Sequence, residues 1–245
     1  MNRKSHIYIV CSDQTRNGKT LFARLLTDFL LMQGGAPFVI DLDAPSGGIC
    51  DFFPENSEVF DVARVAGQME LFDWILATPG RDYVLDVPAR FLDKLFTVMD
   101  DINFMEGARA EGFEVNVFYI VEGSIKSLTT AAMMHDNYTV DRFFVLHHEH
   151  LNEDLKDFKK LSIYNDIIGQ GQIMLPQLDR DVLDELEDES FSFQAFIEGE
   201  ENDMPAKTQF KLASFLEVVV AGIQRIKRRI DIGHVQRVEQ MPEQR

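Results

Sequence analysis

The sequence predicts an α/β fold with a doubly wound, mostly parallel sheet flanked by helices. Short apolar runs rich in β-branched and aromatic residues alternate with helical segments along the chain. The runs are continuously apolar, which is typical of strands buried on both faces of a parallel sheet. The segments between them are long enough for the right-handed crossovers that join parallel strands.

Six segments have the composition of buried strands, and each is bounded by polar residues, glycine or proline. They are residues 6–11, 38–42, 82–87, 114–121, 142–146 and 172–175. The turn at 78–80 separates the third strand from the helix before it, and Pro176 closes the sixth.

The helices are predicted from apolar residues at three- and four-residue spacing. They cover residues 18–32, 57–77 with a break near Gly67, 89–110, 124–134, 153–161, 179–187, 190–197 and 206–230. Gly34 and Gly35 terminate the first of them. One domain over residues 1–231 accounts for all these elements, with 232–245 as a disordered tail and 198–205 as a flexible insertion.

Composition narrows the function classes. The net charge of −17 argues against a general nucleic-acid coat protein, because binding to phosphates relies on clustered Lys and Arg. Residues 179–203 hold eleven acids against one base. We interpret this segment as a solvated helix face, with an acidic docking surface as the alternative. Only Cys11 and Cys50 are present, and neither a signal peptide nor a membrane span is predicted, so we expect a reducing, cytoplasmic setting.

The first strand runs into the loop SDQTRNGKT and then into a helix. The pattern G-x-x-x-x-G-K-[ST] is met at Gly18, Lys19 and Thr20, with Asp13 at the place of the first glycine. A helix N-terminus presents free N–H groups and a positive dipole end to phosphate. We expect Lys19 to reach the β- and γ-phosphates and Thr20 to offer its hydroxyl to Mg²⁺.

The rest of the loop departs from glycine-rich relatives. Asp13, Thr15 and Arg16 stand where related loops often have glycine, which tolerates positive φ, and Asn17 takes the left-handed conformation more easily than most residues. Asp13 also brings a negative charge towards phosphate. A degenerate loop that keeps its shape without binding is the alternative. The candidate nucleotide-binding residues are Asp13, Gln14, Thr15, Arg16, Asn17, Gly18, Lys19 and Thr20.

Carboxylates end the next two strands, in FVIDLDAP and DYVLDVP. Residues at the carboxyl ends of parallel strands border the crevice where ligands bind. We expect Asp86 to hold Mg²⁺ through water, Asp41 to support the metal shell, and Asp43 to orient or deprotonate an attacking water. Taken alone, each aspartate is also an ordinary helix cap.

These motifs, in this order, resemble the MinD/ParA family of P-loop ATPases. VIDLDAPSG is similar to the family's switch-I region, DYVLDVP to its Walker B strand, and VEGSIKSL and IMLP to later segments, over roughly residues 5–230. The resemblance implies ATP or ADP binding with Mg²⁺ and weak ATP hydrolysis, with Lys19 and Asp43 catalytic. It also implies a nucleotide-dependent homodimer and a protein partner or cargo that is positioned or partitioned.

One departure bears on hydrolysis. The family's signature lysine, which reaches a dimer partner's phosphates, is replaced by Gln14, and Arg16 is the nearest substitute cation. Slow or absent turnover follows from this change. The loop also resembles that of dethiobiotin synthetases, so an ATP-dependent enzyme of that kind and a non-hydrolysing adaptor are the alternative functions.

Two further segments carry candidate contacts. The run His147-His148-Glu149-His150 suggests zinc, but adjacent residues rarely converge on one metal. By the family resemblance, His147 or His148 lines an adenine pocket. The basic residues at 224–230 either compensate the helix dipole or contact DNA or an anionic membrane.

Overall fold

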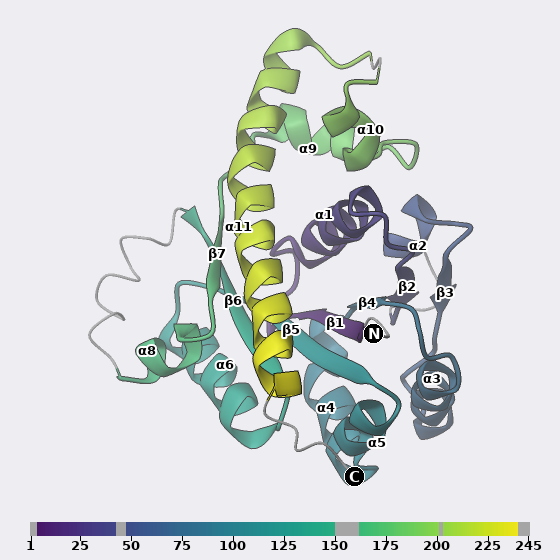
Figure 1. Ribbon diagram of the computed structural model, residues 1–245. Helices are drawn as coiled ribbons and strands as arrows, with labels where there is room; N and C mark the ends of the chain where they lie inside the picture. The colour runs from purple at the N-terminus through teal and green to yellow at the C-terminus, as the bar shows by residue number, and fades with distance from the viewer. Residues whose placement is uncertain (1–3, 43–47, 150–161, 201–202, 240–245) are drawn as a thin grey trace.

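The computed structural model describes residues 4–42, 48–149, 162–200 and 203–239. Its centre is a sheet in which every pair of neighbouring strands is parallel, in the order β3-β2-β4-β1-β5-β6-β7 (Figure 1). The strands are β1 (Ser5–Cys11), β2 (Phe38–Asp41), β3 (Ser57–Val59), β4 (Tyr83–Asp86), β5 (Phe113–Val121), β6 (Arg142–His148) and β7 (Gln172–Leu175). The predicted fold class is confirmed.

Helices cover both faces of the sheet, because successive strand residues point to opposite sides. Tyr8 and Val10 of β1 pack on one face, and Ile7 and Ile9 pack on the other. The first face is covered by α1 (Lys19–Met32), α2 (Ile49–Phe52), α9 (Arg180–Leu186), α10 (Phe193–Glu198) and α11 (Ala206–Glu239). The second is covered by α3 (Val65–Ala77), η1 (Ala89–Phe91), α4 (Leu92–Asp101), α5 (Phe104–Ala110), α6 (Ile125–Asn137) and α8 (Ser162–Ile168).

Two predicted helices differ from those observed. Residues 57–59 form edge strand β3, and Gly67 lies inside α3, where a Cβ would sit 2.0 Å from the Asp61 carbonyl oxygen. Gly67 therefore permits a close approach and does not break the helix. The predicted helix at 89–110 is divided at Asn103, whose φ of 54° ends α4 and begins α5.

The end of the chain also differs from the prediction. Helix α11 continues to Glu239, so residues 232–239 are helical where the sequence predicts a disordered tail. The short α2 and α8 were not predicted. The predicted helix at 153–161 and part of the predicted insertion at 198–205 lie outside the described residues. Within the described ranges, no helix combines the length and apolar character that crossing a membrane requires.

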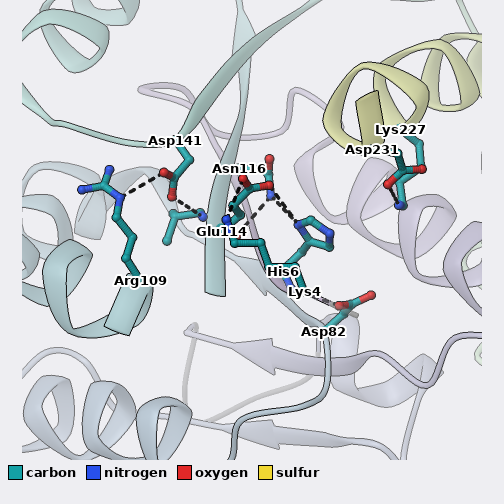
Figure 2. Close-up of polar contacts among 10 residues, drawn as sticks. Lys4, His6, Asp82, Arg109, Glu114, Asn116, Asp141, Lys227 and Asp231 are labelled. Atoms are coloured by element: carbon teal, nitrogen blue, oxygen red, sulfur yellow. Dashed lines mark hydrogen bonds and ion pairs between the residues drawn. The ribbon is translucent and has the colours of Figure 1, made fainter. Parts of the chain in front are cut away.

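A layer of buried polar side chains fixes the amino ends of the central strands (Figure 2). Lys4 Nζ lies 3.0 Å from Glu114 Oε1, and Asp82 Oδ1 accepts the His6 backbone N–H at 3.0 Å. Asp141 accepts from Arg109 Nε at 3.0 Å and from the Val115 N–H at 2.9 Å. This layer lies at the amino ends of the strands, whereas the loop that follows β1 lies at their carboxyl ends.

We expect Asp141→Ala to destabilise the fold by about 2–3 kcal/mol, because it leaves the buried Val115 N–H and the Arg109 charge without this acceptor. Urea unfolding measures the change. Asp136→Ala is the control, since the Asp136 side chain is 70% exposed, and it should shift stability by less than about 0.5 kcal/mol. Equal unfolding midpoints for the two variants would contradict the structural role of Asp141.

Candidate nucleotide site

The loop between β1 and α1 lies at the carboxyl edge of the sheet, with β4 and β5 on either side of β1. This is the edge at which open parallel sheets bind ligands. The first hydrogen bond inside α1 runs from the Phe22 N–H to the Gly18 carbonyl. The N–H groups of residues 19–21 precede that bond and therefore lack a partner within the helix.

Ser12 organises the loop from inside. Its hydroxyl donates to the Ile120 carbonyl at 2.7 Å and accepts from Asn17 Nδ2 at 2.6 Å and from the Gln14 N–H at 3.2 Å. The Asn17 side chain is consequently a brace within the loop. The sequence gives no signal for this role of Ser12, because it depends on a carbonyl of β5.

The positive backbone angles fall at Arg16, with φ of 56°, and at Gly18, with φ of 85°. Arg16 is one of the positions where related loops often have glycine, whereas Asn17, whose residue type tolerates the left-handed conformation, does not adopt it. Asp13 also has no positive φ, so the missing first glycine does not strain the backbone at that position.

The Asp13 carboxylate is bound by three side-chain donors. It accepts from Tyr119 Oη at 3.0 Å, from Ser127 Oγ at 2.9 Å and from Gln14 Nε2 at 3.0 Å. These contacts hold the carboxylate towards β5 and α6. The repulsion of phosphate expected from Asp13 is thereby reduced, and Gln14 is tied to it as a neutral side chain.

Lys19 folds back over the loop. Its ammonium donates to the Gln14 carbonyl at 2.5 Å and to Asn17 Oδ1 at 3.0 Å, and the residue is 8% exposed. Burial lowers the pKa of Lys19, and the nearby Asp86 carboxylate opposes that effect. An anionic ligand beside Lys19 would stabilise the charged form of its ammonium group.

A cavity of about 300 Å³ opens beside Lys19. It brings together all three predicted metal residues, Thr20, Asp41 and Asp86. Thr20 Oγ1 donates to Asp86 Oδ2 at 2.5 Å. A hydroxyl and two carboxylates are the hard oxygen ligands that Mg²⁺ prefers, so the donor set fits this ion. Asp43 lies outside the described residues.

Two residues of this cavity were missed by the sequence analysis. Gly48 has φ of 139°, and a Cβ there would lie 2.3 Å from Asp41 Oδ2, so only glycine leaves room for that carboxylate. Arg90 adds a third cation to the wall, beside Arg16 and Lys19. Among the described residues, no group of three or more His, Cys, Asp or Glu side chains gathers as a metal site. His150, a member of the run that suggests zinc, lies outside the described residues.

A second, mainly apolar cavity of about 240 Å³ lies on the other side of Gly18. It is lined by Leu21, Phe22, Leu25, Leu175, Pro176, Leu178, Leu183, Phe215 and Val219, with Arg16, Asn17, His148 and Gln177 as its polar members. His148 Nε2 lies 3.0 Å from the Asn17 carbonyl oxygen.

The structure places His148 at this cavity, whereas His147 is directed elsewhere. Phe143 and Val145 of β6 pack in the core on the α6 side, and Phe144 and Leu146 pack on the α1 side. His147 continues the first series and His148 the second, because side chains alternate along a strand. The adenine-pocket prediction therefore favours His148.

Helix α1 is anchored to the segment 186–193. Asp28 Oδ2 accepts the Phe193 N–H at 2.8 Å, and Asp28 is 4% exposed. Burial raises the pKa of the Asp28 carboxyl to about 6, against the opposing effects of the Phe193 and Gln194 N–H groups and of Arg24. The ionised carboxylate is thus a cost to the folded state that the neutral acid avoids.

This pKa predicts that Asp28→Asn stabilises the folded protein by an amount that depends on pH. The pKa of Asp28 in the folded protein, about 6, lies above the ordinary 3.8. Ionisation of Asp28 therefore destabilises the folded parent protein, and this destabilisation is absent below pH 3.8 and complete above pH 6. The amide oxygen of asparagine still accepts from Phe193. We expect the stability of the variant relative to the parent to rise by about 2 kcal/mol from pH 4.5 to pH 7.5. Urea unfolding at both pH values measures it, and the exposed Asp73→Asn should show no such rise. A pH-independent difference for Asp28→Asn would contradict it.

The strand–loop–helix, its lysine and threonine, and the two strand-end aspartates define an architecture of the P-loop nucleotide-binding class. No family model and no curated protein matches the chain. Among solved structures it is similar to the McdA–ATP complex from Cyanothece, with a TM-score of 0.48, 12% identity, and coverage of 89% of this chain and 97% of that one.

Two further similarities are to the MinC:MinD cell division protein complex of Aquifex aeolicus and to pNOB8 ParA bound to nonspecific DNA. The first has a TM-score of 0.43 and 16% identity, and covers 98% of each chain. The second has a TM-score of 0.41 and 10% identity, and covers 94% of this chain and 99% of that one. These proteins carry the names of the family that the motifs resemble, and the fold itself follows from the strand order and the loop.

Proposed function

We propose that this protein binds ATP and ADP together with Mg²⁺ at the loop between β1 and α1. The observation that carries the proposal is that Lys19, Thr20, Asp41 and Asp86 line one cavity at the N-terminus of α1. These residues come from three separate segments of the sequence and include both phosphate-binding and metal-binding types.

Different parts of the site would bind the phosphates, the metal and the base. The phosphates would lie at the N-terminus of α1, where Lys19 would exchange its two acceptors in the loop for phosphate oxygens. Thr20 and Asp86 would hold the metal, with Asp41 in its outer shell. The apolar cavity beyond Gly18 would receive the base, between His148 and Pro176.

Weak Mg²⁺-dependent hydrolysis is the finer part of the proposal. Lys19 would stabilise charge on the phosphates, and Asp43 would orient the attacking water. The neutral Gln14 is bound to Asp13, so it does not supply the cation expected of the signature lysine. This observation favours a second candidate, a nucleotide-binding adaptor that turns over ATP slowly or not at all.

The proposed cellular role rests on the resemblance of the motifs to the MinD/ParA family. It comprises a nucleotide-dependent homodimer that positions or partitions a cargo in the cytoplasm. The basic end of α11 is partly engaged within the chain, since Lys227 pairs with Asp231 and Arg229 Nη1 donates to the Gln170 carbonyl at 2.8 Å. Contact with DNA or an anionic membrane there stays a prediction.

Calorimetric titration with ATP and ADP, in Mg²⁺ and in EDTA, tests the proposal. We expect one nucleotide per chain and tighter binding with Mg²⁺, and the absence of any binding heat with a folded sample would refute nucleotide binding. Phosphate release measured on the same sample separates the two candidates. Turnover that is lost in Asp43→Ala supports the ATPase, and tight binding without turnover, unchanged in Asp43→Ala, supports the adaptor.

A further inference from the structure

We propose that Arg24 is a positioning residue that fixes helix α2, and through it the Asp41 carboxylate, at the metal side of the nucleotide cavity. The inference rests on the proposed function, since it concerns the magnesium-dependent part of nucleotide binding. Arg24 itself lines neither of the two cavities at the loop. It lies one helical turn beyond Thr20 on α1, so the helix that carries the phosphate loop also carries this contact.

The Arg24 guanidinium is buried between elements from three parts of the chain. Nη1 donates to the Leu186 carbonyl at 2.6 Å, and Nη2 donates to the Phe191 carbonyl at 3.2 Å. Its central carbon lies 3.3 Å above the centroid of the Phe52 ring and 5.3 Å from that of Phe193. The residue is 4% exposed. Burial lowers the pKa of Arg24 to about 10, with Asp28 opposing, so the charge persists at neutral pH.

The Phe52 contact matters because α2 has only four residues, Ile49 to Phe52. A single turn of this length has no independent stability, so contacts from outside must hold it in place. Figure 1 shows α2 beside α1, at the same edge of the sheet as the loop. The guanidinium stacked on Phe52 supplies such a restraint at the end of α2.

The first residue of α2 is hydrogen-bonded to the Asp41 carboxylate of the cavity. The Ile49 N–H donates to Asp41 Oδ2 at 3.2 Å, and Gly48 leaves just enough room for that oxygen. A displacement of α2 would therefore move the N–H that orients Asp41. The sequence of contacts runs from the carbonyls of Leu186 and Phe191, through Arg24 and Phe52, to Ile49 and Asp41.

Arginine is specifically suited to this place. Its planar group donates in two directions in its plane and stacks on an aromatic ring with its face. Lysine keeps the positive charge but cannot satisfy two separated carbonyls and one ring face together. Arg24→Lys and Phe52→Leu thus interrupt the same connection from opposite sides without touching the cavity.

The test compares ATP affinity in EDTA with ATP affinity in Mg²⁺, by calorimetry, for both variants. We expect the affinity in EDTA to stay within about twofold of the parent, because the loop and Lys19 are unchanged. The gain in affinity that Mg²⁺ provides should fall by about fivefold or more in each variant. The double variant should lose little beyond either single one, since both changes break one connection.

Arg180→Lys is the matched control. Arg180 lies exposed on α9, where it pairs with Asp184, and its replacement should leave both affinities unchanged. Equal losses with and without Mg²⁺ in Arg24→Lys and Phe52→Leu would reduce Arg24 to a structural residue and overturn the proposal, as would an undiminished magnesium gain in both. An absence of ATP binding by the parent protein would instead refute the proposed function, so the two failures are distinguishable.

Discussion

Replacing Lys19 by methionine is expected to weaken ATP binding by about two orders of magnitude, the equivalent of about 2.7 kcal/mol. The ammonium of Lys19 is the cation nearest the loop interior, where it now donates to Gln14 and Asn17 oxygens. Charge-assisted hydrogen bonds to phosphate contribute about 1.5–3 kcal/mol each, so losing them accounts for an effect of this size. Methionine keeps most of the unbranched side chain and removes its charge and its donors.

The same variant should not be less stable than the parent without nucleotide. Burial lowers the pKa of Lys19 although the Asp86 carboxylate opposes this effect, so removing the charge removes a desolvation cost that offsets the loss of its two hydrogen bonds. We expect unchanged or higher stability together with lost affinity, a combination that unfolding of the core cannot produce. Lys126→Met, on the exposed face of α6, is the control and should bind ATP normally. An affinity of Lys19→Met within threefold of the parent would refute its assigned role.

The buried strands were predictable because each is a continuous apolar run. The errors arose where local composition does not decide the structure. Residues 57–59 are Ser, Glu and Val and are largely exposed, and they form β3 only because β2 offers a free edge beside them. Asn103 divides a segment whose apolar spacing alone favours one helix, since its left-handed backbone redirects the chain.

In the candidate site too, some residues could be predicted from the sequence and others could not. Lys19, Thr20, Asp41 and Asp86 were predictable, because their residue types recur at fixed places after successive strands. The orientation of Asp13 was not, because it depends on Tyr119 and Ser127, which are distant in the sequence.

The contacts of Gly48, Arg90 and Arg24 likewise exist only after folding. The stack of Arg24 on Phe52 joins two segments that the sequence treats as unrelated. Sequence reasoning therefore located the groups of the proposed chemistry and missed the groups that hold them in place.

Asp86→Asn should reduce the gain in ATP affinity that Mg²⁺ provides. Asp86 shares a short hydrogen bond with Thr20 and bears a negative charge close to the ammonium of Lys19. Without Mg²⁺, that carboxylate opposes the phosphates, so its removal should leave the affinity in EDTA unchanged or higher. With Mg²⁺, an amide lacks the charge that holds the ion, and the magnesium gain should fall by about tenfold or more, about 1.4 kcal/mol.

The comparison of Asp86→Asn with Lys19→Met separates phosphate binding from metal binding. Lys19→Met should lose affinity in both conditions, whereas Asp86→Asn should lose it only with Mg²⁺. Asp93→Asn, exposed on α4, is the control for the loss of one negative charge and should change neither affinity. If Asp86→Asn kept the full magnesium gain, the metal would have to be held without this carboxylate. The pairing of Thr20 with Asp86 would then be a contact within the protein and not part of a metal site.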